Sequence, residues 1–281
     1  MTEATMDEAV LREWIGRSES ITDTVYAAHA NKLAGTLDDE AVYSNGDPLP
    51  PTWHWAWFVP ASLQSQLGRD GHPALGGFMP PVALPRRMWA GSELVFSKPV
   101  LIGETITKTS TIKDLKMKSG NSGILCFVTV RHDFAGKSGD HRFTDRQTLV
   151  YRDDPARDAS TPKLVKASPG EVLATIEPTP TLLFRYSALT FNTHRIHYDR
   201  DYCINVEGYP GLVVHGPLQA TLLAGEASSR ADGREIAKLA FRARMPLFDT
   251  AGFAICSDGD QLWTQTPEGG VAMSLTVDYA A

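Results

Sequence analysis

The strongest constraint on the fold is an internal repeat. The segments "LVFSKPVLIGET" (residues 94–105) and "LAFRARMPLFDT" (residues 239–250) align at a constant offset of 145 residues. The alignment places leucine on leucine, phenylalanine on phenylalanine and threonine on threonine. Each segment predicts a strand, a turn near a proline and a second strand, and each is followed by another β-rich run. The repeat favours a duplicated unit; chance similarity between two amphipathic strands is the alternative.

Further pairs of segments indicate what each unit contains. "PASLQSQL" (60–67) and "GPLQATLL" (216–223) both predict the start of an apolar helix. "GILCFVTVRHDF" (123–134) and "HRFTDRQTLVYR" (141–152) predict an antiparallel strand pair. A helix packed on an antiparallel sheet is an α+β arrangement. Two such sheets meeting edge to edge would cover the edge that each exposes alone.

A segment rich in Pro, Ser and Ala separates the two units. It contains "PARDASTPKLVKASPGEVLATIEPTP" and has few large apolar residues. Such a composition is typical of a linker. We therefore predict an N-terminal unit over residues 1–154, a linker over 155–178 and a C-terminal unit over 179–281.

Charge, hydropathy and cysteine usage exclude several classes of protein. The net charge is −6 and Lys and Arg are dispersed, which argues against a nucleic-acid partner. No apolar run approaches the roughly 18 to 20 residues that span a membrane, and the N-terminus lacks the pattern of a signal peptide. The three cysteines, without a CxxC, form neither a disulfide framework nor a thiolate zinc site. These features predict a cytoplasmic protein.

Two neighbouring stretches carry groups suited to acid–base chemistry. "LTFNTHRIHYDRDYC" (189–203) holds Asn192 and His197 five residues apart. On a straight helix they would lie roughly 140° apart, so facing one ligand requires a bend between them. Downstream, Pro217 suits the first turn of a helix. Gly216 leaves a bare backbone N–H at its positive end, where an oxyanion can bind.

The order "YSALTFNTHRIH" then "YPGLVVHGPLQA" resembles the hydratase motif of MaoC-type enoyl-thioester hydratases and dehydratases. The resemblance implies a double hot-dog fold, two fused units in which a sheet wraps a central helix. It places His197 on the catalytic histidine and Gly216 on the oxyanion glycine. Asn192 falls where the family motif, D-x-N-P-x-H, has its catalytic aspartate. "WIGRSESIT" and "MWAGSELVFSKPVLIGE" resemble the N-terminal half of fused double hot-dog dehydratases. The whole chain is most similar to the mesaconyl-CoA (3-methylfumaryl-CoA) hydratases.

This resemblance implies a hydro-lyase that reversibly hydrates an α,β-unsaturated acyl-CoA to the 3-hydroxyacyl-CoA. A branched dicarboxylic acyl group, as in mesaconyl-CoA and citramalyl-CoA, fits it. No cofactor is expected, because coenzyme A enters as part of the substrate. One active site per chain is expected, with assembly into a homo-oligomer such as a homodimer left open. The alternatives are a 3-hydroxyacyl-acyl-carrier-protein dehydratase, a non-catalytic acyl-CoA-binding protein and a thioesterase.

The departure at Asn192 raises the question of the second catalytic group. A histidine with a pKa near 6.5 can take and return a proton at neutral pH, but an amide cannot accept one. Either His197 works alone with Asn192 as an orienting group, or a carboxylate joins it. The candidate carboxylates are Asp199, Asp201 and Glu93.

Other residues are candidates for substrate binding. For the thioester region these are His194, Arg195 and His215; for the phosphates of coenzyme A they are Arg86, Arg87 and Lys98. A substrate carboxylate would suit an arginine clamp, for which Arg185, Arg242 and Arg244 are candidates. The alternative roles are packing and helix capping for His215 and solvation for the basic residues. For the cluster "TWHWAWF" (52–58) the alternatives are lining an acyl pocket and core packing. A metal site on His194, His197, Asp199 and His215 is disfavoured, since hydration of this kind needs none.

Overall fold

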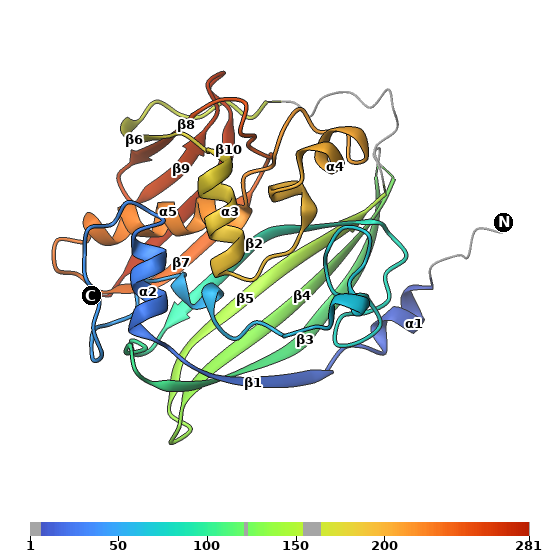
Figure 1. Ribbon diagram of the computed structural model, residues 1–281, viewed down its shortest axis with the longest axis horizontal. Coiled ribbons are helices and arrows are strands. Elements are labelled where there is room, and N and C mark those ends of the chain that lie inside the picture. Colours follow the sequence, from blue (N-terminus) through green and yellow to red (C-terminus); the bar gives the residue numbers. More distant parts are fainter. Residues whose placement is uncertain (1–6, 121–122, 154–163, 281) are drawn as a thin grey trace.

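One antiparallel sheet organises the protein. The computed structural model describes residues 7–120, 123–153 and 164–280. Within them, ten strands run in the order β1-β3-β4-β5-β2-β7-β10-β9-β8-β6 (Figure 1). The N-terminal half supplies β1 (Ser18–Thr24), β2 (Arg86–Phe96), β3 (Thr105–Gly120), β4 (Gly123–Gly136) and β5 (His141–Arg152). The C-terminal half supplies β6 (Glu171–Ile176), β7 (Ile236–Ala243), β8 (Phe253–Asp258), β9 (Gln261–Gln265) and β10 (Val271–Tyr279).

The halves join where the sequence repeat predicts. Strand β2 pairs antiparallel with β7, and Leu94 lies directly opposite Leu239. Both leucines are fully buried. They are also the first residues that the repeat aligns, so the two copies face each other across a local twofold axis. The predicted edge-to-edge meeting of two sheets is confirmed.

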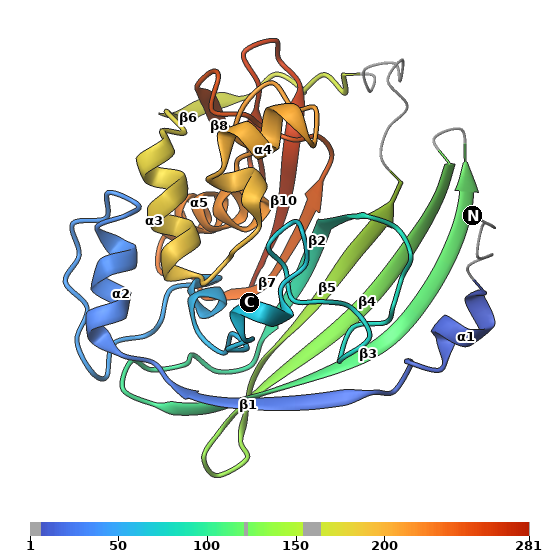
Figure 2. The same ribbon diagram turned by 45° about the vertical axis from the view of Figure 1, so that its right-hand side comes forward.

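The C-terminal half is built around α5 (Gly216–Ser229), as the sequence predicts for residues 216–223. Leu218, Ala220, Leu223 and Ala224 are fully buried, and the helix packs on β7, β9 and β10. Figure 2 shows it in front of these strands, with α3 (Pro180–Leu189) beside it. A helix enclosed on nearly all sides requires the small and apolar side chains that this segment carries.

The N-terminal half does not repeat this helix. The helix predicted over residues 60–67 is wrong, because the segment forms only the short 3-10 turn η2 (Gln64–Gln66). Leu63 is 64% exposed, so the segment buries little apolar surface, and short helices depend on such burial for their stability. Instead, α2 (Ala27–Ala34) and the 3-10 turn η1 (Trp53–Ala56) pack into the core that both halves share.

The predicted hairpin is confirmed as β4 and β5, and part of the predicted linker segment belongs to the sheet. Of the predicted linker 155–178, residues 155–163 lie outside the described part of the chain. Strand β6 lies within the remainder and pairs with β8, so the C-terminal part of the sheet begins before residue 179. At the other end, α1 (Glu8–Arg12) packs against β3. No helix among the described residues is long and apolar enough to cross a membrane.

Candidate active site

The bend predicted between Asn192 and His197 is present. Helix α3 ends at Leu189, and Phe191 adopts a left-handed conformation (φ 50°) that turns the chain. The Asn192 N–H donates to the Ser187 carbonyl (2.8 Å), and its side-chain oxygen accepts from the His194 N–H (3.0 Å). The chain then enters the 3-10 turn η3 (Arg195–His197). Asn192 therefore shapes the turn that presents the histidines.

One ring nitrogen of His197 forms a hydrogen bond with the protein, and the other is free. Its Nδ1 lies 2.7 Å from the Val213 carbonyl oxygen, which can only accept a hydrogen bond, so Nδ1 carries the proton. Nε2 is then the basic nitrogen. The side chain is 7% exposed, and burial lowers its pKa to about 4, although the bond to Val213 opposes the shift. His197 is thus a neutral base at physiological pH.

His215 stacks on His197, with ring centroids 3.7 Å apart and planes 19° apart. Its Nε2 shares a hydrogen bond with the Ser187 hydroxyl (2.7 Å). Its buried Nδ1 has no hydrogen-bond partner in the described part of the chain. Burial, and then the neighbouring histidines, hold the pKa of His215 well below 6.5. The predicted capping role is not seen, because its side chain makes no cap hydrogen bond to α5.

Two further histidines extend this stack, and one of them comes from the N-terminal half. The His194 ring contacts His197 (5.4 Å between centroids) and His72 (4.2 Å). We call His72, His194, His197 and His215 the histidine cluster. Burial, and then the charges of its neighbours, lower the pKa of His194 to about 2. Four adjacent imidazoles must remain largely uncharged, because like charges this close disfavour protonation.

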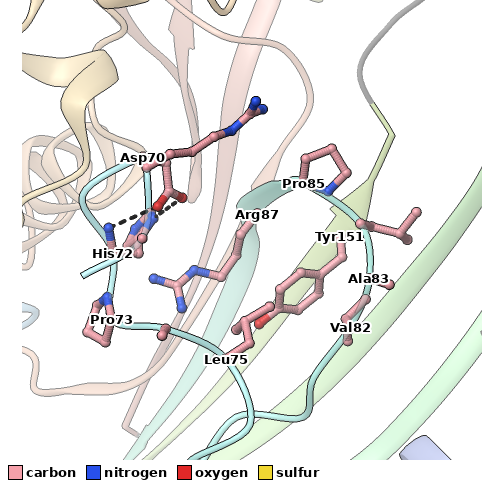
Figure 3. A pocket seen from close by; sticks show the side chains of 13 residues that line it. Asp70, His72, Pro73, Leu75, Val82, Ala83, Pro85, Arg87 and Tyr151 are labelled. Atoms are coloured by element: carbon pink, nitrogen blue, oxygen red, sulfur yellow. Dashed lines mark hydrogen bonds and ion pairs between the residues drawn. The ribbon is translucent and has the colours of Figure 1, made fainter. Parts of the chain in front are cut away.

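Asp70 is the carboxylate that the structure brings to this cluster. It accepts from His72 Nδ1 (2.8 Å) and from the His72 N–H (3.0 Å) (Figure 3). Burial would raise the pKa of Asp70, but hydrogen bonding to His72 lowers it below its ordinary value. The pKa of His72 is lowered to about 4 by burial and then by the charge of Arg87. The sequence reading missed both residues.

The loop that carries Asp70 and His72 reaches the cluster because of a glycine. Gly71 has φ +90°, and a Cβ there would lie 1.9 Å from the Thr193 carbonyl oxygen. The contact is fixed by a bond from the Arg195 N–H to the Asp70 carbonyl (2.8 Å) and by the Thr193 hydroxyl, which donates to the Gly71 carbonyl. A glycine between Asp and His was the only local signal of this approach.

A metal ion could be held by different residues from those considered in the sequence. Donor atoms of Asp70, His72 and His194 all lie within 4.8 Å of one another. However, Asp70 and His72 Nδ1 already form a mutual hydrogen bond, which a bound ion would have to replace. The arrangement is that of a histidine oriented by a carboxylate.

Gly216 begins α5, one residue after His215. A Cβ at this position would lie 3.0 Å from the indole ring of Trp89, on β2. The backbone amides of the first turn have no acceptor within the helix and lie at its positive end. Gly216 therefore permits close packing against Trp89 and leaves room beside a helix start.

The structure separates the predicted basic residues into different environments. Arg86 forms a buried ion pair with Glu207 (3.2 Å), so it does not present its charge to a phosphate. Lys98 is exposed beyond the far end of β2, and that end lies roughly 30 Å from Arg87 at the usual rise per strand residue. Arg195 pairs with Asp199 (2.7 Å) and covers the Tyr202 ring. Of these residues, only Arg87 lines the pocket beside His72.

The carboxylates and arginines that the sequence offered as alternatives do not belong to the histidine cluster. Glu93 pairs with Lys238 on the sheet (2.8 Å), and Asp199 caps α4 (Arg200–Asn205), in whose exposed first turn Asp201 lies. Arg185, Arg242 and Arg244 are exposed. In "TWHWAWF" all three tryptophans pack into the core, as the alternative reading predicts.

Comparisons with known proteins agree with this geometry. The family described as hydroxyacyl-thioester dehydratase type 2 matches residues 52–249. The mesaconyl-C(4)-CoA hydratase of Chloroflexus aurantiacus is 44% identical over 97% of this chain and 99% of its own. A MaoC-like dehydratase from Phytophthora capsici superposes with a TM-score of 0.66 at 13% identity, covering 98% of this chain and 100% of its own. A Mycobacterium tuberculosis protein described as a double hotdog superposes with a TM-score of 0.60 at 11% identity, covering 94% and 96%. The double hot-dog fold is confirmed.

Proposed function

Because the chain belongs to the hydroxyacyl-thioester dehydratase type 2 family, we propose that it reversibly hydrates an α,β-unsaturated acyl-CoA to the 3-hydroxyacyl-CoA. Its similarity to a mesaconyl-C(4)-CoA hydratase makes that branched dicarboxylic thioester the first substrate to test. The observation that carries the proposal is the free Nε2 of His197, buried beside the helix start at Gly216.

The reaction needs one group that moves a proton and one that stabilises negative charge. His197 Nε2 takes a proton from water, and the oxygen of that water bonds to the β-carbon. The electron pair of the double bond shifts through the α-carbon to the thioester oxygen, where the Gly216 N–H and the positive end of α5 stabilise the enolate. His197 then returns the proton to the α-carbon. The fixed tautomer leaves Nε2 as the nitrogen that accepts the proton, and the lowered pKa keeps the ring neutral before the reaction.

Asp70 supplies the carboxylate that the motif lacks at residue 192. It orients His72, which contacts His194, and His194 contacts His197. We assign Asp70, His72 and His194 positioning roles, and we assign Asn192 the role of holding the turn through the His194 N–H. The active site is therefore formed from both halves of the chain.

No cofactor takes part in this scheme, because coenzyme A is carried by the substrate. The three free cysteines are buried, which favours a reducing compartment such as the cytoplasm. Assembly into a homodimer stays a prediction, which sedimentation analysis would test.

The direct test is hydration of mesaconyl-C(4)-CoA, followed by loss of enoyl-thioester absorbance. We expect the purified protein to be active and His197→Ala to lower kcat by about 100-fold or more. The melting temperature should stay within a few degrees of the original. His141→Ala, which changes a surface histidine on β5, is the matched control and should be fully active. Unchanged hydration in His197→Ala would overturn the assignment.

The same assay separates the alternative functions. An acyl-carrier-protein dehydratase would prefer the carrier-bound thioester to the CoA form. A protein that only binds acyl-CoA would show affinity without any absorbance change. A thioesterase would release free thiol, which a thiol reagent detects.

A further inference from the structure

The pocket beside the histidine cluster has a volume of about 400 Å³. One wall is the loop of residues 68–75, which carries His72, and the opposite wall contains Arg87 and Tyr151 (Figure 3). Leu75, Val82 and Leu84 also line the pocket and make much of its surface apolar. The pocket therefore begins at a member of the histidine cluster and extends away from it.

Arg87 and Tyr151 form a pair on one face of the sheet. They lie directly opposite each other in the β2–β5 ladder, so their side chains project to the same side. Trp89 is two residues further along β2 and shares that face, and its indole ring is the group that Gly216 approaches. Arg87 thus lies roughly 7 Å along the strand from the side chain that contacts the proposed oxyanion site. That spacing is comparable to the length of a four-carbon diacid.

Neither group of this pair has an anionic partner among the described residues, although the Arg87 guanidinium lies beside the Tyr151 hydroxyl. Arg87 has no carboxylate within ion-pair distance among the described residues, whereas its neighbour Arg86 is neutralised by Glu207. The Tyr151 side chain is fully buried, and its hydroxyl is not aligned for a hydrogen bond with any described residue. A buried polar group without a partner requires an explanation, and a bound ligand is one. A cation and a hydroxyl donor side by side fit a carboxylate.

We propose that Arg87 and the Tyr151 hydroxyl bind the distal carboxylate of the acyl group, so that the enzyme selects dicarboxylic enoyl-CoA substrates. The inference rests on the proposed function. A phosphate of coenzyme A is the other anion that Arg87 could bind, as the sequence suggested. The pocket favours the acyl group because it starts at His72, a member of the histidine cluster that contains His197. The phosphates are held away from the reacting carbons by the whole pantetheine arm.

The experiment compares two substrates that differ in this carboxylate. Kinetics with mesaconyl-C(4)-CoA and with crotonyl-CoA are measured for the wild type and for Arg87→Met. We expect kcat/KM for the diacid to fall by about 100-fold, the loss typical of a charged hydrogen bond. With crotonyl-CoA it should stay within about threefold. Tyr151→Phe removes one oxygen and should lower kcat/KM by about tenfold, again for the diacid alone.

Arg185→Met is the matched control, since it removes an exposed arginine from α3 and should change neither substrate. Equal losses on both substrates would reassign Arg87 to coenzyme A and overturn the proposal. Unchanged diacid kinetics in both Arg87→Met and Tyr151→Phe would also overturn it. If the wild type hydrated neither substrate, the proposed function itself would fail, and this inference with it. Thermal melting of each variant separates these outcomes from a folding defect.

Discussion

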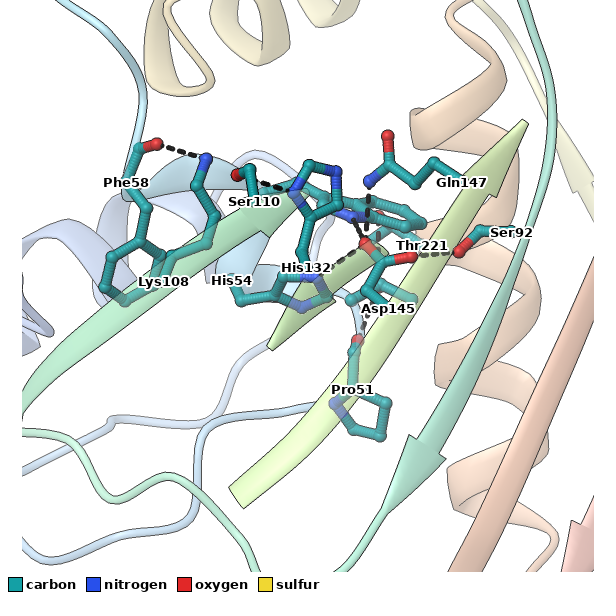
Figure 4. Close-up of polar contacts among 12 residues, drawn as sticks. Pro51, His54, Phe58, Ser92, Lys108, Ser110, His132, Asp145, Gln147 and Thr221 are labelled. Atoms are coloured by element: carbon teal, nitrogen blue, oxygen red, sulfur yellow. Dashed lines mark hydrogen bonds and ion pairs between the residues drawn. The ribbon is translucent and has the colours of Figure 1, made fainter. Parts of the chain in front are cut away.

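The protein buries two groups of histidine and acidic side chains, and these groups differ in how many of their polar atoms form hydrogen bonds. In the N-terminal half the group centres on Asp145, on β5, which is fully buried (Figure 4). Its carboxylate accepts from Trp55 (2.9 Å), from Gln147 (2.7 Å), from His54 (3.2 Å) and from the Ser92 hydroxyl. Burial would raise the pKa of Asp145, but these bonds, led by that from His54, lower it.

The histidine cluster, to which both halves contribute, has no such central acceptor. His215 Nδ1 is buried without a partner among the described residues, and His197 keeps one nitrogen uncommitted. Its carboxylate, Asp70, lies at the edge and is partly exposed. A fully bonded buried network fixes a fold, whereas open hydrogen-bonding positions are available to a ligand. The contrast indicates a structural role for the first group and a chemical role for the second.

The largest effect that would test this contrast is on stability. In Asp145→Ala, the four donors that surround the carboxylate lose their acceptor inside the core. We expect the free energy of unfolding to fall by about 3–5 kcal/mol. Urea denaturation at pH 7 measures this loss. The activity of the molecules that remain folded should stay within about twofold, because Asp145 is not among the groups we assign to the reaction.

Glu93→Ala is the control for removing a carboxylate from the same half. Glu93 pairs with Lys238 on the surface, with side chains 44% and 35% exposed. Exposed pairs contribute little, so we expect a change below about 1 kcal/mol. A loss of activity in Asp145→Ala with normal stability would contradict the division of roles drawn here.

Much of the fold could be predicted because it follows from local periodicity and from the repeat. Leu94 and Leu239 were aligned by sequence and lie opposite each other in the sheet. The prediction of a helix at residues 60–67 was wrong. The pattern of apolar residues does not show whether the rest of the protein offers a surface on which such a helix can pack. In the N-terminal half that surface is covered by α2 and η1, which the sequence did not single out.

The site was predictable only where its residues lie within one short stretch. His194, His197, His215 and Gly216 come from two neighbouring segments, and the structure brings all four together. Asp70 and His72 lie more than a hundred residues away, on an irregular loop. These two residues reach the other histidines because Gly71 packs closely against Thr193. A hydrophobic periodicity in the sequence cannot predict such a contact. Likewise, nothing in the pair Arg86-Arg87 indicates which arginine meets Glu207.

The next largest effect concerns Asp70. Asp70→Asn keeps the size of the side chain but removes the charge that orients His72. We expect kcat for mesaconyl-C(4)-CoA to fall by about 10- to 100-fold with the fold retained. Steady-state kinetics, with circular dichroism as the check on folding, measure this. Asp199→Asn is the matched control: its carboxylate is closer to His197 in sequence but pairs with Arg195, so kcat should change by less than about twofold.

Metal binding by Asp70 can be tested on the wild-type protein. If Asp70, His72 and His194 held an essential ion, dialysis of the wild type against EDTA would abolish activity and zinc would restore it. We expect dialysis to leave kcat unchanged. A metal-dependent recovery would reassign Asp70 from orienting His72 to binding the ion.

The smallest expected effect is that of pH on catalysis. The pKa of His197 is lowered to about 4, mainly by burial, so His197 stays a neutral base throughout the neutral range. We expect kcat to be nearly constant from pH 8 to about 5 and to fall below that. An inflection near 6.5 would indicate a solvated histidine and contradict the burial on which the mechanism depends. Stability should follow a different course, because the unfolded histidine titrates near 6.5.

Between about pH 6.5 and 4, His197 is protonated in the unfolded chain but not in the folded protein. The free energy of unfolding therefore falls as the pH is lowered. Each such histidine contributes up to about 1.4 kcal/mol per pH unit. His132, on β4 beside the Asp145 group, also has a pKa lowered to about 4, mainly by burial. Removing His197 should therefore reduce the acid slope of the unfolding free energy by about one proton while the contribution of His132 remains. Kinetics at low pH would then respond to His197, whereas stability would respond to every buried histidine whose pKa is lowered.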